Sequence, residues 1–223
     1  MYERISLLVR RPELSHAEFV DAWRAGSAAV GADDDGVVRY RQVLPTEPEA
    51  AEFDGLAEVS VERLEDLPDG DDRRDRREFL ALEECAEFVG ERTVQTDEVD
   101  GDTDGLYKHS AFLVRKDGLS HEEFLEYWQT NHTPIAREIE GVVKYDTLVP
   151  PDPESATFDG VAELYFEDLE SLYDALGSEG SRDYDPERGA ARKAREDVDE
   201  FLAIEDRPRF IGRERVVRDD RSN

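Results

Sequence analysis

The chain has 223 residues, and its 57 Asp and Glu against 28 Lys and Arg give a formal net charge of -29. The acidic residues occur along the whole length and only four of the bases are lysine, which we interpret as the surface of a folded cytoplasmic protein from a cell that accumulates molar salt. This charge excludes a basic face for nucleic acid, the apolar runs are far shorter than the roughly 20 residues of a membrane span, and the single cysteine, Cys85, excludes a disulfide framework.

An internal repeat decides how the chain is divided. Residues 2–67 align without a gap with residues 107–172, and 27 of these 66 positions are identical. The C-terminal parts match after a 17-residue gap, 79–81 with 201–203 and 88–90 with 210–212. We interpret this as a tandem duplication, with a first copy over 1–95, an acidic linker over 96–106, a second copy over 107–217 and a tail over 218–223.

Each copy predicts the same order of elements. A strand over 2–10 or 107–115 is followed by a helix, then by strands over 37–44 or 142–149 and over 55–61 or 160–167. A polar helical stretch then ends at 79–80 or 201–202, and a last strand covers 87–95 or 209–217. The insertion near 180–196 either caps a cavity or extends the second helix.

The order β-α-β-β-α-β is the ferredoxin-like arrangement, an α+β fold with both helices on one face of an antiparallel sheet. Because each sheet leaves its other face bare, we expect the two copies to close into an intrachain dimeric α+β barrel. A small-molecule ligand would then lie between the two sheets or within each half. This pseudo-dimer could associate further as a homodimer.

The linker contains a pattern that resembles a metal site. Asp100, Asp102 and Asp104 before Gly105 match the opening of a calcium loop. The twelfth position of such a loop is Ala111, however, where a bidentate glutamate is required. We therefore interpret the segment as a linker and expect no metal site.

The first helix of the second copy presents a candidate base. Ser120 and Glu123 form a capping box, so the helix should begin at His121. The Thr-Pro pair at 133–134 predicts a break and a restart, which places His132 just before a helix N-terminus. The helix dipole disfavours the imidazolium there, so a neutral ring can accept a proton; the alternative is that His132 only hydrogen-bonds across the break.

Two strands of the second copy add further candidates. Alternation places Glu163 on the barrel-lining face, where burial would raise its pKa. If the row of His109 also lines the interior, then His109, His132 and Glu163 share one cavity. The first copy has Arg4 and Ser27 in place of the two histidines. We therefore predict one working site, in the second copy.

Two carboxylates recur in both copies, which favours a structural role. Asp159 corresponds to Asp54 and Glu163 to Glu58. The alternative for the aspartates is a turn carboxylate before glycine, and for the glutamates a buried partner of an arginine.

The second copy resembles a known family. The capped helix with His132 four residues past Trp128, the run Gly141-Val-Val-Lys-Tyr145 and the run Phe158-Asp-Gly-Val-Ala-Glu163 are similar to the EthD domain. Residues 2–95 look like a diverged second copy of it. The family belongs to the dimeric α+β barrel superfamily, whose members include polyketide cyclases, a muconolactone isomerase and monooxygenases that need no cofactor. The resemblance implies an oxidoreductase or an isomerase or cyclase, and His109 is similar to the strand-1 histidine that those cyclases use as a base.

We expect a small-molecule enzyme that moves protons at a carbon acid or a phenol-like substrate without a cofactor. His132 is the candidate general base, His109 a second proton-transfer group, and Glu163 or Asp159 the orienting carboxylate. The candidate substrate contacts are aromatic: Tyr127, Trp128, Tyr145 and Tyr165. The alternatives are a binding or accessory protein that holds a ligand without turning it over, and a redox protein with a bound haem or flavin.

Overall fold

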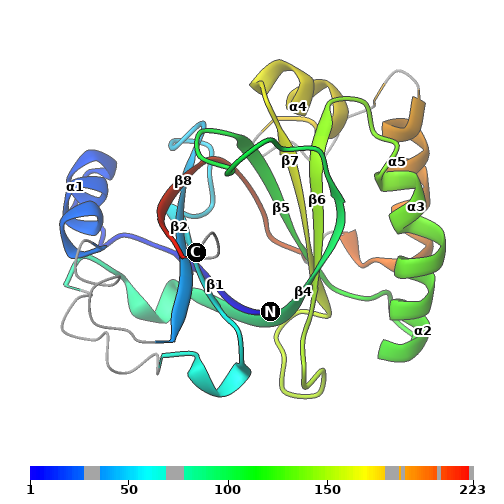
Figure 1. Cartoon of the computed structure of the whole chain (residues 1–223), viewed down its shortest axis with the longest axis horizontal. Helices are drawn as coiled ribbons and strands as arrows, with labels where there is room; N and C mark the ends of the chain where they lie inside the picture. Colours follow the sequence, from blue (N-terminus) through cyan, green and yellow to red (C-terminus); the bar gives the residue numbers. More distant parts are fainter. Residues whose placement is uncertain (28–35, 69–77, 179–185, 187–188, 205–206, 221–223) are drawn as a thin grey trace.

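The fold is a closed antiparallel barrel flanked by helices (Figure 1). The computed structural model describes residues 1–27, 36–68, 78–178, 186, 189–204 and 207–220. In this part of the chain the strands follow the order β1-β3-β2-β8-β5-β7-β6-β4, and β4 pairs with β1. The strands are β1 (Tyr2–Leu8), β2 (Val37–Pro45), β3 (Gly55–Val61), β4 (Ala86–Asp97), β5 (Tyr107–Leu113), β6 (Val142–Val149), β7 (Gly160–Phe166) and β8 (Arg209–Asp219). The predicted α+β fold with an intrachain barrel is confirmed.

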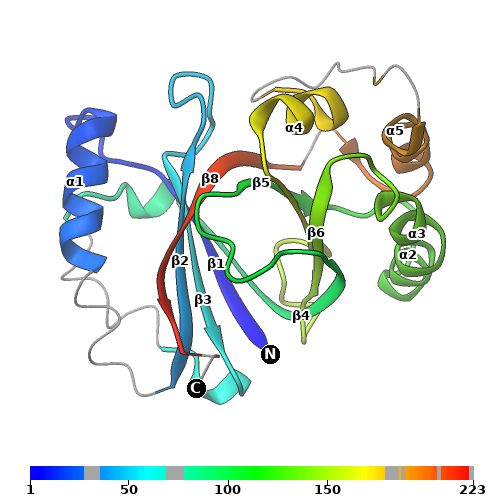
Figure 2. The same ribbon diagram turned by 45° about the horizontal axis from the view of Figure 1, so that its top comes forward.

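Each half of the chain supplies four neighbouring strands, β4-β1-β3-β2 from the first half and β8-β5-β7-β6 from the second. The last strand of each half is long enough to pair with two partners. Residues 86–91 of β4 pair with β1, and residues 91–97 pair with β6 of the other half. β8 pairs in the same way with β5 and with β2 (Figure 2). Backbone hydrogen bonds therefore join the halves at both seams.

Helices cover the outside of the barrel. In Figure 1, α1 (His16–Ser27) lies on one side, and α2 (His121–Tyr127), α3 (Thr133–Ala136) and α5 (Gly189–Phe201) lie on the opposite side. α4 (Leu169–Leu176) lies near β5 and β7. Among the described residues, none of these helices combines the length and the apolar character that a membrane crossing needs.

Two expectations about the second helices fall partly outside the described residues. Between β3 and β4 the structure shows two short 3-10 helices, η1 (Leu64–Asp66) and η3 (Leu82–Glu84), and the stretch 69–77, where a longer helix was expected, is not described. Of the insertion near 180–196, residues 189–196 belong to α5, and the rest apart from Pro186 is also outside the description.

The first helix of the second half continues where the sequence predicted a break. The capping box at 120–123 is confirmed, and α2 begins at His121. The element α3 begins at Thr133 as predicted, but no break precedes it: Thr133 keeps right-handed helical backbone angles, and its N–H donates to the Trp128 carbonyl five residues back. The stretch Trp128–His132 is therefore a π-helical turn, η4. The wider turn directly before Pro134 accommodates the missing proline N–H, so the helix runs on into α3.

A tryptophan in each half packs against a strand glycine. Trp128 is fully buried, and a Cβ on Gly160 would lie 2.6 Å from its ring. Trp23 and Gly55 repeat this arrangement in the first half, at 2.5 Å. Trp128 belongs to the apolar core that fills the space between the second-half strands and their helices. This packing fixes the start of η4 against β7.

Candidate functional site

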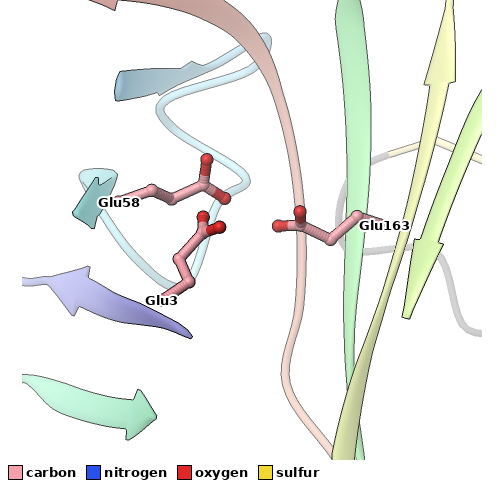
Figure 3. A group of neighbouring side chains, drawn as sticks. All are labelled: Glu3, Glu58 and Glu163. Carbon is pink, nitrogen blue, oxygen red and sulfur yellow. The ribbon is translucent and has the colours of Figure 1, made fainter. Parts of the chain in front are cut away.

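The barrel interior holds a network of buried ion pairs. Lys108 Nζ lies 2.8 Å from Glu163, and Arg92 lies 2.6 Å from Glu3 and 2.7 Å from Glu163. Figure 3 shows Glu3 and Glu58 pointing toward Glu163 from the opposite side of the barrel. We call the following eight buried or nearly buried residues the interior network: Glu3, Arg41, Glu58, Arg92, Lys108, Asp146, Glu163 and Glu214. Glu163 thus lies on the barrel-lining face, as alternation predicted, and its surroundings match the alternative of a buried partner of an arginine.

The net shift in the pKa of Glu163 is downward, whereas the sequence predicted a rise. Burial alone would raise it, but Lys108 and Arg92 hold the pKa of this carboxyl well below its usual range. The opposite holds for Glu58, whose pKa is raised well above its usual range by burial and by the neighbouring Glu163 and Glu3. The interior network therefore favours a proton on Glu58 and a charge on Glu163.

Three carboxylates of the network approach each other as metal ligands do. Glu3, Glu58 and Glu163 each offer an oxygen, and these atoms lie within 4.8 Å of one another. The lysine and the two arginines of the network already contact them. Side chains thus supply the positive charge that a cation would bring, and we interpret the group as structural.

Three of the four pairs of equivalent positions in the network carry opposite charges in the two halves. Glu3 corresponds to Lys108, Arg41 to Asp146, and Arg92 to Glu214. The contacts recur with the signs reversed, because Arg92 with Glu3 at 2.6 Å corresponds to Glu214 with Lys108 at 3.3 Å. Like charges at both positions would repel across the interior. The network therefore joins one half to the other.

Tyr165, a candidate ligand contact, also lies in this interior. Its hydroxyl accepts a hydrogen bond from Arg41 at 2.8 Å, and Lys108 lies over its ring. Burial raises the pKa of Tyr165 well above its usual range. A ligand contact through this hydroxyl would have to displace the network.

His109 lies on the other face of β5. Lys108 and Ser110 point toward Glu163, at 2.8 and 3.3 Å, whereas Ala111 belongs to the core beneath the helices. The prediction that His109 shares a cavity with Glu163 is therefore wrong: alternation groups the residues correctly, but the row of His109 faces the helices. The structure puts His109 and Glu163 on opposite sides of one sheet.

The surroundings of His109 are apolar and positively charged. The residue is 7 % exposed, and its Nδ1 has no hydrogen-bond partner within the described part of the chain. Burial, followed by the charges of Arg209 and Arg207, lowers the pKa of His109 well below its usual range. The imidazole is therefore neutral.

His132 is the last residue of η4, and its side chain pairs with a carboxylate of α5. Its Nδ1 is 2.8 Å from Asp197, and the Tyr127 hydroxyl donates to the other oxygen of the same carboxylate at 2.9 Å. The ring packs on Phe201, with the centroids 5.0 Å apart. Asp197 and Phe201 are four residues apart on α5, so they face the same way. The side chain of His132 remains 13 % exposed.

This pairing defines the state of the imidazole. Burial lowers the pKa of His132; the hydrogen bond with Asp197 opposes this shift, and the charge of Arg207 adds to it. The predicted neutral ring agrees with this direction, although burial and not the helix dipole is the main cause. With Nδ1–H donating to Asp197, Nε2 carries the free lone pair. The charge of Arg207 lowers the pKa of both His132 and His109.

Comparisons with known proteins agree with this geometry. Residues 116–205 match the family model of the EthD domain. The second half carries an EthD domain. Tyr127, His132 and Asp197 all lie within the matched segment, whereas Arg207 and Arg209 lie just beyond it.

Solved structures share the fold around the EthD domain. An anthrone oxidase-like protein is 11% identical, with 98% of this chain and 94% of that chain covered and a TM-score of 0.64. A mutant chlorite dismutase from Candidatus Nitrospira defluvii is 12% identical, with 95% and 90% covered and a TM-score of 0.58. None of the curated proteins matches the chain in sequence. At these identities the structures show a common barrel fold.

Three other residues predicted for the site, Asp159, Trp128 and Tyr145, have contacts that indicate a structural role. Asp159 accepts hydrogen bonds from the Arg115 backbone at 2.8 Å and contacts His121 at 3.0 Å, as Asp54 does with Arg10 and His16 in the first half. This arrangement matches the turn-carboxylate alternative. The other two, Trp128 and Tyr145, are fully buried in the helix-side core.

A pocket of about 230 Å³ lies away from both histidines. It is lined by residues 87–89 at the start of β4 and by residues 150–152 and 155–157 of the β6–β7 connection. Its lining includes Phe88, Pro150 and Pro151 but contributes no histidine from the described residues. It is therefore separate from the candidate site.

The sequence did not indicate three of the residues at this site. Asp197 is one of 57 acidic residues, and nothing in its local pattern separates it from the others on the same polar helix. Arg207 precedes the last strand and Arg209 begins it, and the sequence does not show which face of the sheet their side chains occupy. Correspondence between the copies is the one available signal, since Cys85 and Glu87 occupy these positions in the first half.

Proposed function

We propose that the second half is a small-molecule enzyme in which His132 acts as a general base on a carbon acid or a phenol-like substrate. The observation that carries this proposal is the contact of 2.8 Å between His132 Nδ1 and Asp197, a carboxylate that Tyr127 also binds. This arrangement holds Nδ1 protonated and leaves Nε2 as the proton acceptor. The names of the structural neighbours, an anthrone oxidase-like protein and a chlorite dismutase, support an enzyme acting on a small molecule.

In the proposed step, Nε2 of His132 takes a proton from a C–H or O–H bond, and the electron pair of that bond stays on the substrate. The imidazolium that forms is stabilised by the adjacent Asp197 carboxylate, which Tyr127 keeps in place. Burial keeps the ring neutral before the reaction, since it lowers the pKa of His132. His109 remains a predicted second proton-transfer group. The composition supports a cytoplasmic location in a salt-accumulating cell.

The test is proton exchange into solvent. The purified chain in molar KCl is incubated in D₂O with 1,3-dicarbonyl compounds and phenols, and loss of substrate C–H signals is followed by NMR. His132→Gln should lower the exchange rate by about 100-fold or more, the usual contribution of a general base. Because the base must be neutral, the rate should fall only as the pH drops below the ordinary histidine value of 6.5.

The matched control is His16→Gln in the first half, where the histidine contacts Asp54 at 3.3 Å. This variant should exchange protons at the parent rate. Exchange that persists unchanged in His132→Gln would refute the role of His132. Tight ligand binding without any exchange would instead support the binding-protein alternative.

A further inference from the structure

We propose that the pocket between the start of β4 and the β6–β7 connection binds a small phenol with a single ring. This site is separate from the candidate base His132, so the inference goes beyond the proposed function. It is argued from the equivalent place at the other seam of the barrel, where a tyrosine of this chain is bound, and from an unpaired stretch of backbone in the pocket.

The pocket has a counterpart at the β2–β8 seam. Through the repeat, its three lining segments correspond to residues 209–211, 45–47 and 50–52. The strand pairing agrees, because Val89 is opposite Arg4 in the first half and Ile211 is opposite the equivalent His109 in the second. Both places therefore lie where the last strand of one half meets the connection between two strands of the other half.

Helix α4 covers the counterpart. The Tyr173 hydroxyl donates to Glu47 at 2.6 Å and lies 3.1 Å from the Thr46 hydroxyl. Three residues further along α4, the Leu176 carbonyl accepts a hydrogen bond from Arg209 at 2.7 Å. These contacts involve three of the nine positions that correspond to the pocket lining. A phenol group is thus what the chain itself supplies at the β2–β8 seam.

The pocket keeps the carboxylate of this arrangement but lacks the tyrosine. Pro68 stands at the position equivalent to Tyr173, and the first half has the short 3-10 helix η1 where the second half begins α4. Asp152 corresponds to Glu47 and is exposed in the pocket lining. The pocket therefore presents the acceptor of a phenol hydroxyl without the phenol.

The backbone of Val89 adds a second polar requirement. Because Arg92 donates its N–H toward the β1 side, alternation points the N–H and C=O of Val89 the other way. The β4–β6 register, continued by two residues, places Pro151 opposite Val89. The equivalent Thr46 donates its N–H to the Ile211 carbonyl at 3.2 Å, but Pro151 has no N–H. Among the described residues, no hydrogen bond joins Val89 to this connection.

The volume and the lining suit one aromatic ring. An apolar cavity of about 150 Å³ holds a benzene molecule, and this pocket has about 230 Å³. Phe88, Pro150 and Ala156 give the ring apolar surface. A phenol hydroxyl both donates and accepts, so it can donate to Asp152, as Tyr173 does to Glu47, and accept from the Val89 N–H.

The experiment titrates the full ¹⁵N-labelled chain in molar KCl and follows its backbone amide signals by NMR. The probes are p-cresol, which is the side chain of tyrosine, and 4-methylanisole, which has the same ring but no donor. p-Cresol should shift the Val89 signal to saturation and bind about fivefold or more tightly than 4-methylanisole, since one hydrogen bond separates them.

Two variants and a matched control locate the site. Asp152→Ala should weaken p-cresol binding about fivefold or more, because it removes the acceptor. Glu47→Ala removes the equivalent carboxylate at the other seam and should bind p-cresol like the parent. Ala156→Leu puts a larger side chain into the pocket lining and should abolish the shift of the Val89 signal.

Any of four results would overturn the site: equal binding of the two probes, p-cresol binding that Asp152→Ala leaves unchanged, a Val89 shift that persists in Ala156→Leu, or no Val89 shift at millimolar p-cresol. Failure of the proposed function looks different. His132→Gln should still show the Val89 shift with the same dependence on Asp152. A chain that binds p-cresol in this way but exchanges no substrate protons would keep the pocket and refute the base.

Discussion

Glu58 and Glu163 occupy equivalent positions and point toward each other across the barrel, yet their pKa values move in opposite directions (Figure 3). Both are buried, so the difference comes from neighbours. Lys108 contacts both carboxyls, Arg41 contacts Glu58 and Arg92 contacts Glu163. A hydrogen bond from Glu58 lowers the pKa of Glu163 further. Repulsion by Glu163 and Glu3 helps to raise the pKa of Glu58. One carboxyl of the pair therefore keeps its proton so that the other can stay ionised.

Neutralising each member of this pair should have unequal effects. Glu58→Gln resembles the protonated side chain already present, so it should change the free energy of unfolding at pH 7 by less than about 1 kcal/mol or increase it. Glu163→Gln removes a charge that Lys108 and Arg92 require, and should cost about 3 kcal/mol or more. Urea unfolding of both variants in molar KCl measures the difference. Equal losses would show that both side chains are ionised.

The pH dependence gives the same pair a second test. The folded pKa of Glu58 lies above the unfolded value of 4.5, so above about pH 4.5 the folded state holds one more proton than the unfolded state. Its contribution therefore makes stability fall as the pH rises, by about 1.4 kcal/mol per unit until the folded pKa is reached. Glu58→Gln should remove this slope. A profile that Glu58→Gln leaves unaltered between pH 5 and pH 7 would contradict the assignment.

At the scale of elements, the π-helical turn explains how two side chains reach one carboxylate. Residues five apart on an α-helix point in directions roughly 140° apart, because each turn takes 3.6 residues. The hydrogen bond from Thr133 to Trp128 widens the turn, so Tyr127 and His132 both reach Asp197. Turns of this kind are frequent at functional sites.

Sequence reasoning predicted the periodicity of the elements better than their surroundings. The strands at 142–149 and 55–61 and the helix start at His121 agree with the structure, because alternation and capping act locally. Alternation also placed His109 and Ala111 on the same face of their strand. Which face of the strand packs against the helices depends on the other half of the barrel, and alternation does not show this. Asp197 escaped prediction because its contact with His132 spans 65 residues. The first half as a diverged EthD unit stays a prediction.

The packing of Trp128 on β7 makes Gly160 sensitive to any side chain. A Cβ at this position would lie 2.6 Å from the indole ring and 3.1 Å from the Leu148 carbonyl, so ring or strand must move. Gly160→Ala should lower the free energy of unfolding by about 1–3 kcal/mol. Gly26→Ala, in α1, is the control: its nearest neighbour is 3.9 Å away, and alanine should stabilise the helix by up to about 1 kcal/mol. Thermal unfolding of the two variants should therefore shift in opposite directions.

At the scale of the whole molecule, most equivalent positions of the interior network carry opposite charges in the two halves. The ion pairs at the two seams instead keep the same charge at equivalent positions. Lys144 with Asp97 at the β4–β6 seam corresponds to Arg39 with Asp219 at the β2–β8 seam. In the centre three of the four equivalent pairs have opposite signs, and the fourth pair is Glu58 with Glu163. The space between the sheets, one of the two places predicted for a ligand, is thus occupied by ion pairs that bind one half to the other. The candidate site lies outside the barrel, beneath the helices.

This relation predicts that single charge reversals fail where a complete exchange succeeds. Glu3→Lys places a lysine beside Arg41 and Arg92, and should cost about 3 kcal/mol or more, because buried charges lose their partners. Exchanging all equivalent positions between the halves rebuilds every contact in the opposite sense and leaves composition and net charge unchanged. The exchange comprises Glu3 with Lys108, Arg41 with Asp146, Arg92 with Glu214, and Ser60 with Tyr165. The exchanged chain should unfold in urea at a higher concentration than Glu3→Lys. An exchanged chain no more stable than the single reversal would mean that features other than charge complementarity hold the halves together.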